Sequence, residues 1–185
     1  MGAQTGSYDP RELSVRVSAG ARLAAGIVAG VIGGLLLIGT MVIYANVTGA
    51  GWDTPLKALG AFVYGLESYI IGPVPILAGA LIQLGFSIVV GIIFALFVSR
   101  ATSVIATMIV GMLVGLAVWV AMDLAVLPFW NPTMASRMAL MPIAYLAGHV
   151  LFGIGLGTTP IFVRAFSRER RSRSSRIRAA QAQPT

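Results

Sequence analysis

Residues 23–52 read LAAGIVAGVIGGLLLIGTMVIYANVTGAGW, a stretch without a single Asp, Glu, Lys or Arg. This exceeds the roughly 20 apolar residues that an α-helix needs to cross the hydrocarbon core of a bilayer. Three more such intervals lie between Glu67 and Arg100, between Arg100 and Asp123, and between Arg137 and Arg164. We therefore predict an all-α integral membrane protein with four transmembrane helices, near residues 22–47, 73–99, 102–126 and 138–164.

The composition also indicates that lipid is the solvent of this chain. Hydrophobic residues make up 57% of the 185 residues and charged residues only 10%. Four spans leave no length for a separate catalytic domain, and the absence of cysteine excludes disulfides and thiolate ligands. The sequence also lacks a nucleophile–base motif, a metal-ligand cluster and a phosphate-binding glycine loop. We predict that the protein is not an enzyme and carries no cofactor.

The positions of Lys and Arg predict the orientation, because positive residues gather on the cytoplasmic side of membrane proteins. Only Lys57 and Arg137 fall on the side away from the termini. The other eleven share the side of the termini: Arg11, Arg16, Arg22, Arg100, Arg164, Arg168, Arg170, Arg171, Arg173, Arg176 and Arg178. Both termini are therefore predicted to be cytoplasmic.

Two segments flank the predicted transmembrane domain, which covers residues 22–166. Asp9-Pro10-Arg11-Glu12 is a typical helix start, so residues 1–21 are predicted to contain a short interfacial helix. Residues 167–185 form a basic tail that we expect to be disordered and either to anchor the topology or to bind anionic lipid headgroups. Its headgroup candidates are Arg168, Arg170, Arg171 and Arg173. No aromatic residues alternate with the arginines, so nucleic-acid binding is not expected.

The first and second halves of the chain align with each other. At an offset of 81, Gly30, Gly34 and Met41 fall on Gly111, Gly115 and Met122. At an offset of 66, Gln83, Phe86, Ile88 and Gly91 fall on His149, Phe152, Ile154 and Gly157. This favours two tandem helical hairpins in parallel repeat, although glycine-rich helices also align by chance. The first outer connection is longer, and Asp53-Thr54-Pro55 followed by Leu56, Leu59, Phe62, Val63 and Leu66 predicts a short amphipathic helix on the outer surface that could cap the hairpin interface.

Small residues recur every four positions in three of the spans. Such ridges allow helix backbones to approach closely in lipid, where no hydrophobic force drives helices together. The predicted packing residues are Gly26, Gly30, Gly34, Gly111, Gly115, Gly153 and Gly157. The sequence leaves open whether the contacts lie within one chain or between chains.

Three polar residues form the candidate polar or transport site. His149 lies near mid-membrane and its repeat counterpart Gln83 at a similar depth, so both should lie in the bundle centre. Asp123 is the nearest carboxylate that could serve a proton relay, although it lies nearer the outer end. The alternative is a purely structural, neutral imidazole that bonds Gln83, Ser87 or a backbone carbonyl. A haem held by His149 and Met112 or Met122 is disfavoured, because there is no second histidine. Asp123, Glu67 and Arg137 are expected at the outer surface, where they either form ion pairs or are solvated.

Two stretches of the second half carry a family resemblance. Trp119 to Pro128, and then Leu146-Ala-Gly-His149-Val-Leu-Phe-Gly-Ile-Gly-Leu-Gly157, resemble small bacterial inner-membrane proteins of unknown function. The resemblance covers the last two spans, and the first half departs from it by having Gln83. It implies a four-helix protein of the bacterial inner membrane without an assigned activity.

Two functions fit these observations. The first is a non-enzymatic accessory or scaffold subunit that associates with other membrane subunits or with itself through its small-residue faces. The second is a small carrier or proton-linked permease with a polar site between the hairpins at Gln83 and His149. A polar cavity that joins Gln83, Asp123 and His149 would favour the carrier, and a dry core the accessory subunit.

Overall fold

The computed structural model describes residues 18–98, 102–132, 134–136 and 141–168. Four helical segments in these ranges are long and apolar enough to cross a membrane: Ala19–Val47, Val74–Phe97, Val104–Trp130 and Pro142–Arg168. The described residues contain no strand. The prediction of an all-α membrane fold with four spans is therefore confirmed. The helix predicted near residue 9 and the tail from residue 169 lie outside the described residues.

Helix α1 (Ala19–Val47) begins at Ser18, whose hydroxyl oxygen accepts a hydrogen bond of 3.2 Å from the Ala21 amide. At 1.5 Å per residue its 29 residues extend about 43 Å. This exceeds the roughly 30 Å of a hydrocarbon core, so the helix must tilt or project into the headgroup region. The chain leaves α1 through Gly49, whose φ of +76° favours glycine.

The predicted outer helix is present as α2 (Thr54–Tyr64), followed by the 3₁₀ turn η2 (Gly65–Tyr69). It packs against α3 (Val74–Phe97). Leu56 and Leu59 lie buried, as the spacing predicted. Val63 keeps the helical phase of these two residues, seven and four positions after them, but it is exposed. Leu66 is exposed as well and lies outside α2, because the chain switches to η2 at Gly65, so the predicted helix is shorter than expected.

The third span is longer than predicted because it continues through a proline. α4 (Val104–Ala121) passes into a π-helical turn, η3 (Met122–Val126), and then into α5 (Leu127–Trp130). Pro128 has no N–H to donate within the helix, and the register widens before it. The Leu127 amide donates to the Met122 carbonyl, five residues earlier. The span thus ends at Trp130 instead of residue 126.

The fourth span contains an interruption. α7 (Pro142–Leu156) ends in a turn at Gly157 and Thr158, and the helix resumes from residue 159 to residue 168. Pro160 cannot donate to the Leu156 carbonyl. The Thr159 hydroxyl donates to that carbonyl at 2.6 Å instead, so the backbone acceptor stays paired inside the bundle.

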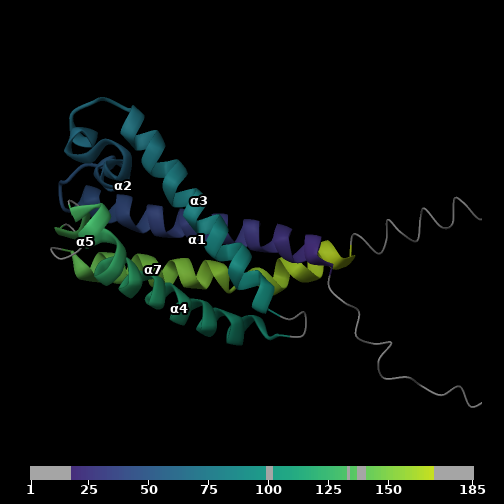
Figure 1. Cartoon of the computed structure of the whole chain (residues 1–185). Helices are drawn as coiled ribbons and strands as arrows, with labels where there is room; N and C mark the ends of the chain where they lie inside the picture. Colours follow the sequence, from purple (N-terminus) through teal and green to yellow (C-terminus); the bar gives the residue numbers. More distant parts are fainter. Residues whose placement is uncertain (1–17, 99–101, 133, 137–140, 169–185) are drawn as a thin grey trace, which may run out of the picture.

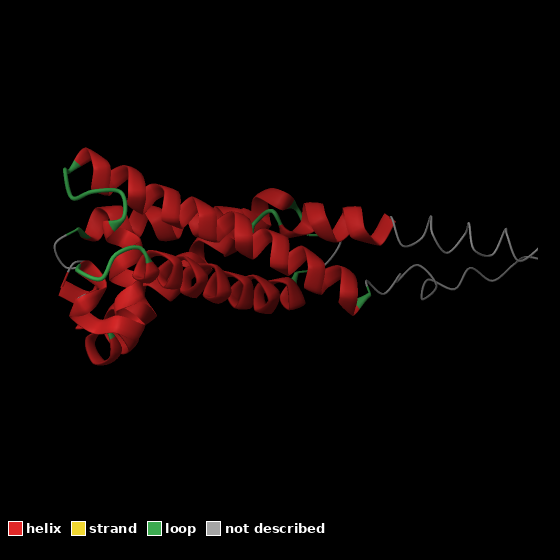
Figure 2. Cartoon of the chain, turned by 90° about the horizontal axis from the view of Figure 1, so that it is seen from above, coloured by secondary structure: helices red, strands yellow, loops and turns green. Residues whose placement is uncertain are grey.

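The four spans lie side by side in the order α3, α1, α7, α4 (Figure 1). The main contacts join α1 to α3, α4 to α7 and α1 to α7, whereas α3 and α4 make no substantial contact. The start of α1 and the end of the last span lie at the same end of the bundle (Figure 1). α2 and α5 lie at the other end (Figure 1), and the view from above shows the long helices running between the two ends (Figure 2).

The glycine ridges are helix contacts within the chain. A Cβ atom added at Gly26 would lie 2.7 Å from the Gly91 carbonyl oxygen of α3. Added Cβ atoms at Gly30 and Gly34 would collide with Ser87 of α3. In the second hairpin, Gly111 and Gly115 of α4 face the backbone of α7, and Gly153 of α7 and Gly157 of the turn after it face α4. All seven predicted packing residues therefore lie at helix crossings.

The two hairpins cross at equivalent residues. Gly30 of α1 meets Ser87 of α3, and the residues offset from them by 81 and 66, Gly111 and Gly153, meet each other in the second hairpin. The predicted alignment thus matches the packing register, which chance similarity between glycine-rich helices would not require.

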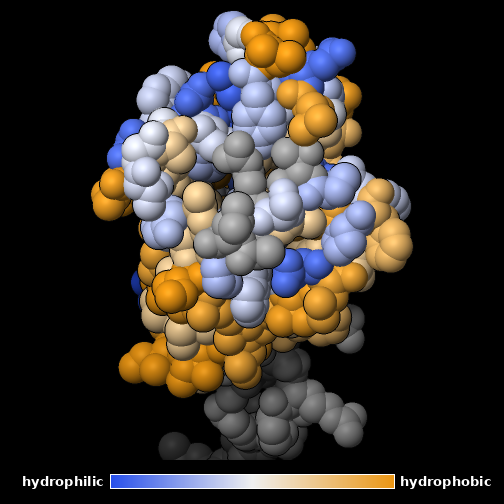
Figure 3. Space-filling view, turned by 90° about the vertical axis from the view of Figure 1, so that its left-hand side faces the viewer, coloured by the Kyte–Doolittle hydropathy of each residue, from blue (hydrophilic) through white to orange (hydrophobic). Residues whose placement is uncertain are grey.

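Described charges are segregated to the two ends. At the end with the start of α1, the Arg22 and Arg164 guanidinium groups donate to the carbonyls of Leu96 and Thr102, each at 2.8 Å. At the end with α2, Lys57 and Asp53 form an ion pair of 2.8 Å. Hydrophilic residues gather on that end (Figure 3). Arg137 lies outside the described residues, so its predicted ion pair with Asp123 or Glu67 stays a prediction.

Candidate functional site

A cavity of about 410 Å³ lies between the two hairpins. α1, α3, α7 and the third span supply its walls, and α2 contributes Pro55, Leu56, Leu59 and Phe62. Nearly all of its lining is aliphatic, aromatic or thioether, and none of the described residues that line it carries a formal charge. Its volume falls within the roughly 300–1,000 Å³ of small-molecule sites in proteins.

Equivalent residues of the two hairpins line this cavity. Offsets of 81 and 66 relate the members of four pairs, and both members of each pair are lining residues. The pairs are Leu37 with Val118, Met41 with Met122, Gln83 with His149, and Phe86 with Phe152. The cavity is therefore lined by residues at corresponding sequence positions of the two hairpins.

Glycines bring α1 and α7 into direct backbone contact on one side of the cavity. Gly33 of α1 and Gly155 of α7 approach so closely that a Cβ added at Gly155 would lie 2.5 Å from the Gly33 Cα. The equivalent positions on the other side are Val114 of α4 and Val89 of α3. Branched side chains there do not permit the same backbone approach, so α3 and α4 stay apart and the cavity remains between them.

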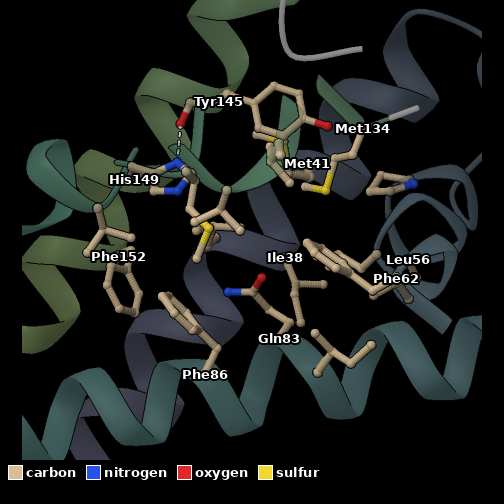
Figure 4. Close-up of a pocket in the computed structure, with 18 of the residues that line it drawn as sticks. Ile38, Met41, Leu56, Phe62, Gln83, Phe86, Met134, Tyr145, His149 and Phe152 are labelled. Atoms are coloured by element: carbon tan, nitrogen blue, oxygen red, sulfur yellow. Dashed lines mark hydrogen bonds between the residues drawn. The ribbon is translucent and has the colours of Figure 1, made fainter. Parts of the chain in front are cut away.

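His149 lies in the wall formed by α7, with only 7% of its surface exposed. Its Nδ1 is 2.8 Å from the Tyr145 carbonyl oxygen, one helical turn earlier (Figure 4). A carbonyl oxygen only accepts hydrogen bonds, so Nδ1 carries a proton and donates it. No carboxylate among the described residues lines the cavity to offset an imidazolium charge. In a neutral ring with its proton on Nδ1, Nε2 is an acceptor.

Gln83 lies in the opposite wall, formed by α3, with 8% of its surface exposed. Its Nε2 donates to the Ser87 hydroxyl oxygen at 3.1 Å. Figure 4 shows Gln83 and His149 extending from opposite walls into the same space. Both lie in the bundle centre, as predicted, but each forms its hydrogen bond within its own helix.

Asp123 does not join this pair. It lies in the π-helical turn, partly buried, and is not a lining residue of the cavity. A cavity that connects Gln83, Asp123 and His149 is therefore absent from the described part of the chain. The neighbouring Met122 faces the cavity, and adjacent side chains of a helix point in directions about 100° apart, so Asp123 projects away from the lining.

The spacing of Leu56, Leu59 and Phe62 predicted one apolar helical face that could cap the hairpin interface, and these three side chains of α2 line the cavity there. Sequence reasoning missed Asn131. It is buried, and its side-chain amide donates to the Ala58 carbonyl at 2.9 Å, which ties the end of the third span to α2.

Comparison with known protein families, with curated proteins and with solved structures found no match to this chain. The resemblance to small bacterial inner-membrane proteins therefore stays a prediction.

Proposed function

We propose that this protein is a non-enzymatic small-molecule carrier or receptor that takes a largely apolar molecule from the bilayer into the cavity between its hairpins. The cavity of about 410 Å³, with its apolar walls and its pair of buried polar side chains, is the observation that carries the proposal. A ligand gains dispersion contacts with the walls, and the few polar groups select its orientation. The lack of substantial contact between α3 and α4 supports entry from the lipid side.

The cavity favours a neutral cargo over proton-linked transport. A proton relay through His149 requires a partner that exchanges protons with it, usually a carboxylate. Asp123 lies outside the lining, and no other carboxylate among the described residues faces the cavity. We therefore propose binding or carriage of an uncharged molecule without a coupled proton.

The accessory or scaffold function stays an untested alternative. Its motivation was the set of small-residue faces, and these faces are occupied by contacts within the chain. Mass spectrometry of partners that co-elute in mild detergent tests it directly. A stoichiometric membrane partner would favour the accessory function over the carrier.

A matched pair of valine substitutions tests the carrier proposal. Val118 lines the cavity, whereas Val120, on the same helix, faces outward and is exposed. Val118→Trp should fill the cavity, and Val120→Trp should leave it open. Extracts of the purified wild type and of Val120→Trp should contain a small apolar molecule at near-stoichiometric amount that Val118→Trp lacks. Identical extracts from all three folded proteins would refute the proposal.

We further propose that the protein lies in the bacterial inner membrane with both termini cytoplasmic. The segregation of Arg22 and Arg164 to one end of the described residues supports this orientation. The chain has no cysteine, so single-cysteine variants label cleanly. In intact cells an impermeant maleimide should react with Ala50→Cys and spare Ser103→Cys. The reverse pattern would invert the topology.

A further inference from the structure

The two buried polar side chains offer the cavity mainly hydrogen-bond acceptors. The Nδ1–H of His149 donates to the Tyr145 carbonyl, so Nε2 carries no hydrogen and can accept a hydrogen bond. One N–H of the Gln83 side chain donates to the Ser87 hydroxyl oxygen. The carbonyl oxygen of Gln83 can still accept a hydrogen bond, and its second N–H can still donate one. Neither the Gln83 oxygen nor the His149 Nε2 is among the fully enclosed unpartnered atoms of the described chain, and both atoms belong to side chains that line the cavity.

A molecule that forms hydrogen bonds with both His149 and Gln83 must itself donate a hydrogen bond. A buried acceptor left without a partner loses the free energy of hydration and gains nothing in return. A hydroxyl group can donate to the His149 Nε2 and accept from the remaining N–H of Gln83 at the same time. An ester or ether oxygen only accepts and leaves the imidazole unpaired.

The charge of the walls excludes ionic headgroups. Phosphate or carboxylate groups in a dry site need a cation nearby, and an ammonium group needs a carboxylate. The described lining residues include neither. The other polar lining groups belong to Trp130, which is largely exposed, and to Tyr145, whose ring points toward Met134 and away from His149 (Figure 4).

We infer that the cavity binds a neutral, hydroxyl-bearing membrane lipid, whose hydroxyl donates to His149 Nε2 and accepts from Gln83 while its hydrocarbon part fills the apolar walls. This inference rests on the proposed function, because it names the chemical class of the cargo.

The single histidine makes the inference directly testable by NMR. Protein without a histidine tag, labelled with ring ¹⁵N in histidine and with ¹³C in methionine methyl groups, is titrated in nanodiscs with dodecanol and with dodecyl methyl ether. Met41, Met122 and Met134 line the cavity and report its occupancy by either probe. Met108 and Met112 lie outside the lining and serve as internal controls.

The expected result has two parts. The ¹⁵N spectrum of the free protein shows a protonated Nδ1 and a bare Nε2. Dodecanol shifts the Nε2 resonance and the three cavity methionines, whereas the ether shifts only the methionines and binds on the order of tenfold more weakly. His149→Phe keeps an aromatic ring, and in a folded variant it should abolish the preference for the alcohol. Gln83→Met should reduce the preference while it leaves the helix contacts of α3 in place.

Each other outcome overturns a defined part of the scheme. If both probes shift the cavity methionines with equal affinity and Nε2 does not respond, the hydroxyl assignment is wrong and the apolar carrier stands. If neither probe shifts the cavity methionines, the carrier proposal and this inference both fall. A protonated Nε2 with a bare Nδ1 in the free protein would overturn the inference before any ligand is added.

Discussion

The α1–α7 side and the α3–α4 side of the bundle are equivalent in the two-hairpin arrangement, but one is closed and the other holds the cavity. On the closed side, Gly33 and Gly155 bring two backbones into contact. On the open side, Val114 and Val89 occupy the corresponding positions. The size of the side chains at these few positions thus influences whether two membrane helices pack in direct contact or remain separated by a cavity.

The comparison also shows how such a protein can hold a cavity without losing its fold. Helices in lipid associate through close packing and not through a hydrophobic force, so stability depends on where backbones touch. Here the glycine crossings within each hairpin and between α1 and α7 supply that contact. The remaining side is free to serve a ligand.

Alanine substitutions of two phenylalanines at equivalent positions should differ most in their effect on the free energy of unfolding. Phe152 is 1% exposed, whereas Phe86 is 36% exposed. Phe152→Ala should lower the free energy of unfolding by about 3 kcal/mol, because a fully packed ring is lost. Phe86→Ala should cost less than about 1 kcal/mol, because its ring already borders open space. Reversible unfolding in mixed micelles measures both, and equal losses would show that the two sides are packed alike.

A glycine pair tests the closed side itself. Gly155→Val places the residue of the open side into the α1–α7 contact and should destabilise the protein by about 2 kcal/mol through overpacking. Gly85→Val is the control, since nothing lies within 4 Å of a Cβ added there. Its stability should change by no more than about 0.5 kcal/mol. A tolerated Gly155→Val would mean that the backbones do not need to touch.

The two outer connections also differ in how firmly a polar residue is held, and the expected difference in stability between their variants is smaller. Asn131 donates to the Ala58 carbonyl and accepts from the Met134 amide at 3.0 Å, whereas Asp53, which follows Trp52 as Asn131 follows Trp130, forms an ion pair with Lys57. Asn131→Ala should cost about 1.5 kcal/mol, because it removes two hydrogen bonds in a buried setting. Asp53→Ala should cost only a few tenths of a kcal/mol, as exposed pairs do. Thermal unfolding of both variants in one detergent makes the comparison, and similar losses would contradict it.

Sequence reasoning located the spans, the glycine crossings and the pair of Gln83 and His149, because each depends on local spacing or on an alignment between the halves. It offered a small polar cavity at Gln83 and His149 only as one alternative and did not predict a largely apolar one. The residues that distinguish the open side, Val114 and Val89 in place of Gly33 and Gly155, are not unusual in a membrane helix. The π-helical turn was missed as well, since Pro128 alone does not determine how the helix before it widens.

The Asp53–Lys57 ion pair gives the smallest expected effect, which pH should reveal. The hydrogen bond from the Lys57 side chain holds the pKa of the Asp53 carboxyl below its usual value of 3.8. The unfolded chain therefore takes up this proton at a higher pH than the folded chain does. The pair stabilises the fold fully above the unfolded pKa, and this stabilisation is lost as the pH falls through the folded pKa.

Screening by solvent limits the contribution of this pair to roughly 0.3 kcal/mol. The test compares wild type with Lys57→Gln at about pH 6 and about pH 2, so that the lower pH lies below the depressed pKa of Asp53. The variant should be slightly less stable at the higher pH and equally stable at the lower one, because the pair contributes only while Asp53 is ionised. A stability difference that persists at the lower pH would assign the effect of Lys57 to its packing on α2 and not to its charge.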